Sequence, residues 1–372
     1  MCRTTCATGG QAGRSIDWGA LRVRLMGKLR TATGVLALIV VFTSPSPALS
    51  NPSRTLMGIG FYVDFDPNSW TAVRLEGHRL NWVITTNYVL ANPTGVLAGS
   101  HDPAIVALAR SRGSRVHFRV ANLINDHYDA ELARAILTKP AASIRAIASI
   151  LQIVRDYAYD GVVLDLQELA PTDQLALSGF VKDLATQLHN RSRPLSVIVP
   201  AKPQETRAIV DAYDLGALSR AADWIILQAY DGQHVAAPAA PLAPLPWVDS
   251  AIRHALGYVP ASRLILGIGL LGYDRPAQGT GEIISMREAV GRAQRAGAPI
   301  LWDEVAQAPY FTAFGRTVYF EDARSIERKL TVAARYHIAG TAFWRLGGET
   351  PDLWGVAEAF LRPPSTDVSF TH

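Results

Sequence analysis

The sequence predicts an α/β fold of the (β/α)8 TIM-barrel type, with a small α+β insertion after the seventh strand. Eight short apolar runs recur along the chain without polar alternation, which is typical of parallel strands covered on both faces. Longer segments of helical periodicity separate these runs. Eight strand–helix units in about 310 residues match the size of a closed barrel. The runs are residues 57–65, 82–90, 115–123, 161–166, 195–201, 224–230, 264–272 and 340–346.

Helical periodicity between the runs supports the barrel. In residues 172–189 apolar side chains recur at spacings of three and four, and residues 141–157 repeat this pattern. Pro171 suits the first turn of the former helix, where a missing N–H costs no hydrogen bond. An open doubly wound sheet is the alternative. It would usually show a glycine-rich turn after its first strand, whereas Gly58 and Gly60 lie inside the first run.

The last strand–helix unit is interrupted. Residues 274–318 separate the seventh run from the next helical pattern, and this connection is longer than a usual βα loop. A helical pattern over residues 285–296 lies within it. We expect these residues to form the α+β insertion, which would make a wall over the barrel mouth.

The first 50 residues are expected to be a leader with a secretory signal peptide. Lys28 and Arg30 precede a nine-residue apolar run, and prolines and small residues follow up to Ser50. A membrane anchor is the alternative, but nine residues fall short of the roughly 20 that span a bilayer. Met26 would start a compact signal by itself, which would leave residues 1–25 as a mis-assigned start.

The leader sets the expected location and domain limits of the protein. A signal peptide predicts a secreted or extracytoplasmic protein (periplasm or cell envelope) with no membrane span in its mature part. The barrel should then occupy residues 51–364, and residues 365–372 a short tail.

The excess positive charge and both cysteines of the chain lie in the leader. The whole chain has a net charge of +4, but residues 1–50 hold six basic side chains and one acidic one, leaving 30 basic and 31 acidic residues. The remainder therefore gives no argument for nucleic-acid binding. Cys2 and Cys6 are the two cysteines of the chain, so no disulfide or thiolate metal site is expected beyond them. We expect neither metal nor cofactor, because no histidine cluster shows ligand spacing.

Residues 160–168 combine an apolar strand with polar groups at its C-terminal end. An unpaired buried carboxylate is costly, so apolar runs rarely carry one without a use. Alternate side chains of a strand share a face, which groups Asp165 with Gln167 and turns Glu168 the other way. The C-terminal strand ends of a β/α barrel carry its chemistry. We therefore expect Asp165 and Gln167 at the barrel mouth.

This segment resembles the acidic strand-four motif of family-18 glycoside hydrolases, the chitinase-like barrels. Their pattern is Asp-Gly-x-Asp-x-Asp-x-Glu. Asp160, Gly161 and Asp165 match it. Val163 stands at the middle aspartate and Gln167 at the acid, so the catalytic motif is degenerate.

Further segments extend the resemblance over nearly all of residues 56–356. Residues 228–231, Gln-Ala-Tyr-Asp, resemble the strand-six signature whose tyrosine and aspartate line the sugar site. Residues 61–64 resemble the first strand. Residues 343–347 resemble the last strand, whose tryptophan floors the subsite of hydrolysis. The resemblance is nearest to bacterial spore-cortex-type enzymes and to barrels of exopolysaccharide systems.

The resemblance implies substrate-assisted hydrolysis of an N-acetylhexosamine polysaccharide, such as a chitin-like polymer, peptidoglycan or an exopolysaccharide. Asp165 would orient the acetamide group, Tyr230 would hydrogen-bond to it, and Trp344 would be the apolar platform beneath the sugar. Asp231 would bind hydroxyl groups. The remaining candidate substrate-binding residues are Tyr62, Asp64, Asn122 and Asp160.

Gln167 leaves two functions open. An amide can hydrogen-bond to a glycosidic oxygen but cannot deliver a proton at neutral pH. Loss of a general acid costs about 10²–10⁴-fold in rate, or roughly 3–5 kcal/mol. The first reading is a glycan-binding barrel with weak or no hydrolysis. The second is an active retaining glycosidase in which Glu168, turned inward by a bulge, or another carboxylate such as Glu349 donates the proton.

The site residues also have purely structural readings. Asp165 could be a buried carboxylate satisfied by the backbone, and Trp344 could be part of the core. Tyr230 and Asp231 could be a strand end followed by a helix cap.

Overall fold

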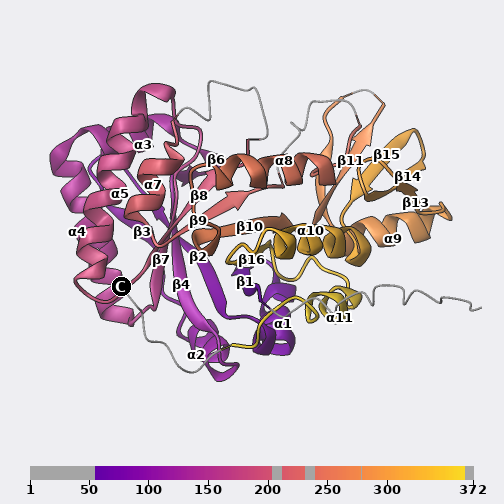
Figure 1. The fold of residues 1–372 in the computed structure, drawn as a ribbon, viewed down its shortest axis with the longest axis horizontal. Helices are drawn as coiled ribbons and strands as arrows, with labels where there is room; N and C mark the ends of the chain where they lie inside the picture. The colour runs from indigo at the N-terminus through magenta and orange to yellow at the C-terminus, as the bar shows by residue number, and fades with distance from the viewer. Residues whose placement is uncertain (1–54, 203–211, 231–238, 278, 365–372) are drawn as a thin grey trace, which may run out of the picture. The chain divides into compact units, whose positions relative to one another are not determined.

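Eight parallel strands close into a barrel in the computed structural model, which describes residues 55–202, 212–230, 239–277 and 279–364 (Figure 1). The strand order is β1-β16-β10-β9-β8-β7-β4-β2, and β1 also pairs with β2, which closes the ring. The predicted fold is confirmed, and each predicted run contains one barrel strand. The strands are β1 (Met57–Tyr62), β2 (Trp82–Leu90), β4 (Arg115–Ala121), β7 (Gly161–Asp165), β8 (Leu195–Pro200), β9 (Trp224–Gln228), β10 (Leu264–Gly269) and β16 (Gly340–Trp344). These strands belong to one compact unit, and the expected leader lies outside the described residues.

Helices surround the strands, and aspartate caps begin several of them. Asp66, Asp102, Asp129, Asp214 and Asp322 accept backbone N–H bonds at the starts of α1, α2, α3, α7 and α10. The two helices predicted from periodicity are confirmed as α4 and α5. The helices are α1 (Pro67–Glu76), α2 (Pro103–Ser111), α3 (Ala130–Thr138), α4 (Pro140–Tyr157), α5 (Gln174–His189), α7 (Leu215–Ala221), α8 (Leu245–Leu256), α10 (Ala323–Arg335) and α11 (Asp352–Ala357). No helix among the described residues has the length and hydropathy needed to cross a bilayer.

Short elements complete the barrel. A single 3-10 turn precedes α5, so the helix predicted from residue 172 begins with tighter winding. The short elements are β3 (Leu97–Gly99), β5 (Leu123–Ile124), β6 (His127–Tyr128) and the 3-10 turns Gly77–Arg79, Pro171–Asp173 and Ala261–Arg263.

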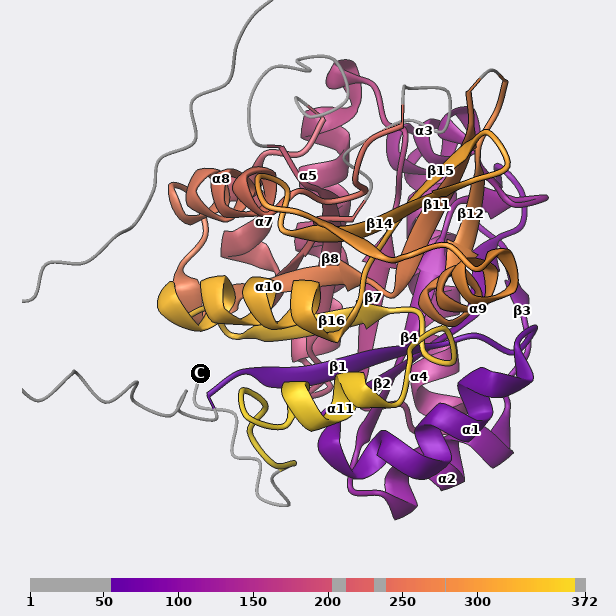
Figure 2. The ribbon, with the colours of Figure 1, turned by 90° about the vertical axis from the view of Figure 1, so that its right-hand side faces the viewer.

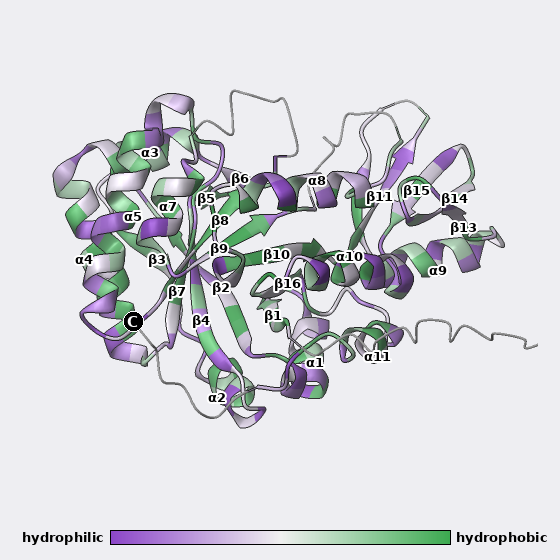
Figure 3. Cartoon of the chain, viewed as in Figure 1, coloured by the Kyte–Doolittle hydropathy of each residue, from purple (hydrophilic) through white to green (hydrophobic). Residues whose placement is uncertain are grey.

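Two apolar layers form the core. Val163 of β7 lies in the layer inside the barrel, whereas its neighbours Val162 and Leu164 pack in the layer between strands and helices. Figure 3 shows the strands mostly apolar and the outer helix surfaces mixed. The alternation predicted from strand parity is therefore confirmed for β7. The inner layer consists of Met57, Ile59, Phe61, Trp82, Ile84, Val163, Ile198, Ile226, Ile265 and Ala342.

The insertion is a separate antiparallel sheet with one helix. Its strand order is β12-β11-β15-β14-β13, and α9 (Met286–Ala296) covers one face (Figure 2). The seventh run, predicted as one strand over 264–272, is divided between two sheets. Gly272 already lies in the second sheet, where an added Cβ would come 2.5 Å from Phe320 Cβ. The strands are β11 (Leu271–Pro276), β12 (Glu282–Ser285), β13 (Leu301–Asp303), β14 (Ala308–Ala313) and β15 (Arg316–Phe320).

The two ends of the described barrel meet at its N-terminal face. Leu56, just before β1, forms a parallel bridge with Leu361, beyond α11. The Leu56 N–H donates to the Phe360 carbonyl at 3.1 Å, and the Arg362 N–H donates to the Leu56 carbonyl at 2.9 Å. These bonds fix both ends of the barrel on the side away from its mouth.

Candidate active site

The carboxylate of Asp165 is held by three side chains at the C-terminal end of β7. Arg119 Nη1 on β4 lies 3.0 Å from Oδ2, and the Tyr128 hydroxyl of β6 donates to the same oxygen at 2.9 Å. Gln167 Nε2 donates to Oδ1 at 2.7 Å. Only 2% of Asp165 is exposed, so these bonds replace its hydration. The carboxylate is thus fully engaged by the protein.

Gln167 lies beside Asp165 with both amide hydrogens directed into the protein. Besides its bond to Asp165, Nε2 donates to Gln228 Oε1 at 3.4 Å. Asn122 fixes the backbone of Gln167, accepting its N–H at 2.9 Å and donating to its carbonyl at 3.1 Å. The orientation of the amide follows from its neighbours, because the Asp165 carboxylate can only accept. Gln167 Oε1 is then the polar atom of this side chain left for a ligand.

Trp344 and Tyr230 form the aromatic side of the mouth. Trp344 ends β16 and is half-buried, with its ring parallel to that of Tyr230 at 6.4 Å between centroids. Phe61 meets the indole edge-on at 5.2 Å. The Arg119 guanidinium carbon lies 5.4 Å from the indole centroid, so Arg119 links the aromatic group to Asp165. The structure therefore brings together Asp165, Gln167, Tyr230 and Trp344.

Glu168 lies outside this network. It has a φ of 59°, which ends the extended geometry of the strand, and its side chain is exposed. Its neighbours Leu166 and Leu169 are buried in the outer layer, and the Tyr213 hydroxyl donates to the Leu166 carbonyl at 2.7 Å. Within the described part of the chain, Glu168 makes no hydrogen bond to the residues around Asp165.

Glu349, the other candidate proton donor, is occupied within its own loop. Its carboxylate accepts from the Gly347 N–H at 2.6 Å and from Trp354 Nε1 at 3.3 Å. Burial raises the pKa of Glu349 above its usual value, against the lowering effect of these hydrogen bonds. The residue is thus a buried loop anchor.

Asp160 does not belong to the mouth, which corrects its assignment to substrate binding. It immediately precedes β7, whereas Asp165 ends that strand. Five residues of strand separate the two by about 17 Å. Asp160 Oδ2 instead accepts from the Val116 N–H at 2.8 Å and from Arg110 at 3.3 Å. It therefore ties strand ends together at the opposite face of the barrel.

The remaining predicted binding residues have separate locations. Tyr62 is buried in the layer between strands and helices, and Asp64 is exposed beyond β1. Asn122 is completely buried and positions Gln167 rather than opening to solvent. Asp231 lies outside the described residues.

Arg119, Tyr128 and Gln228 also belong to the site, although no sequence motif predicted them. Arg119 alternates with His117 inside an apolar run, and both side chains are buried. A buried arginine needs a partner as much as a buried aspartate does. The presence of one arginine and one aspartate within two buried strands could therefore have predicted the ion pair between Arg119 and Asp165.

The floor beneath the site is apolar and contains one histidine. His117 stacks on Trp82 at 4.5 Å between centroids and is 1% exposed. Burial lowers the pKa of His117 to about 3, so the ring is neutral at ordinary pH. The described residues contain no cluster of three or more histidine, cysteine, aspartate or glutamate side chains that could hold a metal ion.

Comparison with known sequences identifies the family of this barrel. Residues 124–349, more than half of the chain, match the family described as Glycosyl hydrolases family 18. The chain belongs to glycosyl hydrolase family 18. The matched region contains Asp165, Gln167, Tyr230 and Trp344.

Two bacterial proteins with names that refer to sporulation or the cortex are similar to this chain. The chain is 27% identical over 276 residues to the cortical fragment-lytic enzyme of Bacillus subtilis (strain 168), covering 71% of this chain. It is 29% identical over 279 residues to YdhD of the same organism, which is named a sporulation-specific glycosylase, covering 72% of this chain. The chain spans 64% and 66% of the lengths of these two relatives.

Solved structures of a chitinase and of a spore cortex-lytic enzyme share the fold of this chain. A chitinase from Chromobacterium violaceum ATCC 12472 has a TM-score of 0.76 and 26% identity, with 82% of this chain and 98% of that chain covered. The Bacillus cereus spore cortex-lytic enzyme SleL has a TM-score of 0.75 and 24% identity, with 82% and 75% covered.

Proposed function

We propose that this family-18 barrel is secreted, binds an N-acetylhexosamine-containing polysaccharide at its mouth, and hydrolyses it weakly or not at all. The observation that carries the proposal is the pair formed by Asp165 and Gln167. Kinship with cortex-lytic enzymes and a chitinase supports the class of ligand, and the apolar leader sequence supports export.

The proton donor is the first reason for weak hydrolysis. Residue 167 stands where the family motif has its glutamic acid, and an amide has no proton to give at neutral pH. Its two N–H groups are also directed to Asp165 and Gln228 rather than outward. The loss of general acid catalysis alone removes about 10²–10⁴-fold in rate.

The engagement of Asp165 is the second reason. In substrate-assisted hydrolysis this carboxylate would have to turn to the acetamide group of the sugar. Here it already takes three hydrogen bonds, from Arg119, Tyr128 and Gln167. Each bond to a charged group contributes roughly 1.5–3 kcal/mol, so reorienting the carboxylate is costly.

The aromatic side of the mouth supports binding. Trp344 is half-buried, its indole lies next to Tyr230, and its other contacts to Phe61 and Arg119 hold the ring in place. A rigid aromatic platform contributes apolar contact at little conformational entropy cost. Gln167 Oε1 would accept an N–H or O–H group of the bound sugar.

Calorimetry with N-acetylglucosamine oligomers tests this function. Trp344→Ala should weaken binding by about 1–3 kcal/mol, or roughly 5- to 150-fold in Kd. Phe314→Ala is the matched control, because Phe314 is an aromatic residue of the insertion that is 89% exposed. Absence of binding to any amino-sugar polymer would refute the proposal. Cleavage at ordinary enzyme rates that Glu168→Ala abolishes would instead establish the active glycosidase with Glu168 as donor.

A further inference from the structure

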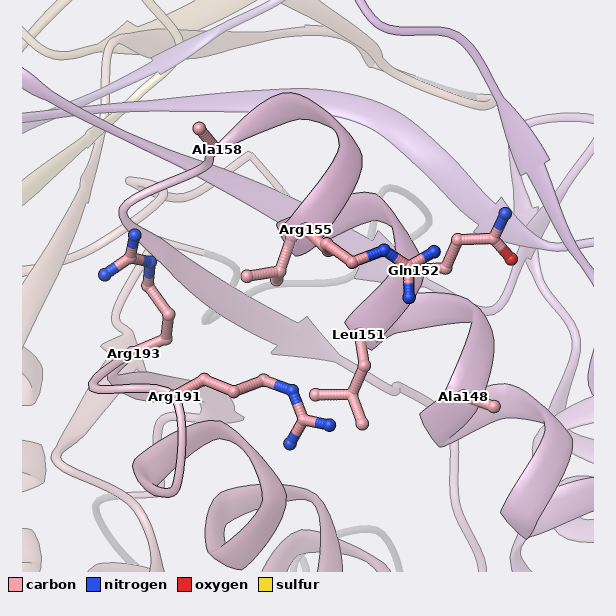
Figure 4. A pocket seen from close by; sticks show the side chains of 8 residues that line it. Ala148, Leu151, Gln152, Arg155, Ala158, Arg191 and Arg193 are labelled. Atoms are coloured by element: carbon pink, nitrogen blue, oxygen red, sulfur yellow. The ribbon is translucent and has the colours of Figure 1, made fainter.

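A basic pocket lies at the face of the barrel opposite the mouth. It forms between the C-terminal half of α4 and the loop that precedes β8, and its volume is about 510 Å³. Arg155 lines it from the helix, and Arg191 and Arg193 line it from the loop (Figure 4). Both segments lead to the N-terminal ends of β7 and β8, whereas Asp165 stands at a C-terminal strand end. The pocket is therefore separate from the site already described.

Two of the guanidinium groups are held by carbonyl oxygens rather than by carboxylates. Arg191 Nη1 donates to the Gln187 backbone carbonyl at 2.6 Å and to its side-chain oxygen at 3.3 Å. Arg193 Nε donates to the Tyr159 carbonyl at 2.9 Å. A carbonyl bond fixes the direction of the guanidinium but leaves its positive charge uncompensated. Both arginines thus keep their charge available to a ligand.

The rest of the pocket does not supply the missing negative charge. None of the described residues that line it is acidic. Arg155 forms an ion pair with Asp156 at 3.0 Å, but its side chain is 72% exposed, where such a pair contributes little. Leu151 and Val154 give the pocket an apolar wall. Residues 51–372 have a net charge of −1, so the positive charge around this pocket is local and does not reflect the charge of the whole barrel.

We propose that this pocket binds a polyanionic chain through its phosphate or carboxylate groups. The planar fork of arginine matches both kinds of group with two parallel hydrogen bonds. Three arginines around one hollow suit a ligand with two or more anionic groups, and the apolar wall would contact its carbon framework. The proposal does not rest on sugar binding at the mouth.

Titration calorimetry of the full chain tests the proposal with two probes, inorganic tripolyphosphate and tri-galacturonate. The double variant Arg155→Gln/Arg191→Gln should raise the Kd of a bound probe at least about tenfold. Arg145→Gln is the matched control, since Arg145 is exposed on the same helix but does not line the pocket. Raising salt from about 50 to about 200 mM should weaken binding, because charge drives it.

The two probes also distinguish the sources of the charge. Binding of tripolyphosphate alone identifies a phosphate polymer, and binding of tri-galacturonate alone identifies an acidic polysaccharide. Binding of both supports recognition of anionic groups in general. Binding of neither probe, or an equal loss in Arg145→Gln, overturns the proposal. Affinity for N-acetylglucosamine oligomers should stay unchanged in the double variant, which separates this pocket from the mouth.

Discussion

Replacing Gln167 by glutamate should turn the barrel into a measurable glycosidase. The new carboxyl group would stand 2.7 Å from Asp165 Oδ1, where the amide nitrogen now lies. Two carboxylates at that distance repel each other when both are ionised, so the pair would share one proton near neutral pH. Because Arg119 and Tyr128 both donate hydrogen bonds to the other oxygen of Asp165, that proton would reside mainly on residue 167, the position of the acid.

The expected gain in hydrolysis rate follows from the contribution of a general acid to catalysis. A positioned acid contributes about 10²–10⁴-fold, or roughly 3–5 kcal/mol of barrier. We expect Gln167→Glu near the lower limit, about 10²-fold, because Arg119 still restrains Asp165. Release of a chromophore from an N-acetylglucosamine oligomer measures the change. Gln187→Glu, an exposed substitution of the same kind on α5, is the control.

Two results would contradict this reasoning. One is a Gln167→Glu variant that binds the oligomer as tightly as the native protein yet shows no gain in cleavage. The other is a native protein that already cleaves at ordinary rates and keeps them in Glu168→Ala. The first result would show that a carboxyl group at residue 167 does not supply the missing catalysis. The second would show that the proton reaches the leaving group from a residue other than Gln167 or Glu168.

Three further predictions concern the stability of the site. Arg119→Met should lower the free energy of unfolding in urea by about 3–5 kcal/mol, because it leaves Asp165 buried without its cation, whereas an undiminished value would show the pair to be dispensable. Asn122→Ala should cost at least about 1–3 kcal/mol by leaving the buried Gln167 backbone groups unsatisfied, and it should weaken oligosaccharide binding as well. The pKa of His117 is about 3 in the folded chain and about 6.5 when unfolded, so below pH 6.5 the unfolded chain binds a proton that the folded chain does not. The contribution of neutral His117 to the free energy of unfolding is therefore complete above pH 6.5 and decreases by about 1.4 kcal/mol per pH unit down to pH 3. His117→Phe should flatten that part of the curve of unfolding free energy against pH, and an unchanged slope would place the acid sensitivity elsewhere.

The fold was predictable because its signals are local. Most barrel strands are largely apolar runs, and the periodicity of α4 and α5 spans several turns. The division between β10 and β11 was missed, because the residues around Leu270 remain apolar across it and only the packing of Gly272 against β15 reveals the second sheet.

The parts of the site that were predictable are those in which the alternation of side chains along a strand determines which way a side chain points. Asp165 and Gln167 share the mouth as alternation requires. The partners of Asp165 were missed, since Arg119 comes from another strand and Tyr128 from a short hairpin that no sequence pattern aligns with β7. Asp160 was misplaced because a motif match carries no information about which end of a strand a residue occupies.

The bridge between Leu56 and Leu361 determines how this barrel can be displayed. Both attachment points lie on one side, and the half-buried indole of Trp344 opens on the other. A tether, tag or partner domain joined before residue 55 or after residue 364 would leave the mouth unobstructed. Immobilisation through either end should therefore preserve ligand capture on a sensor surface.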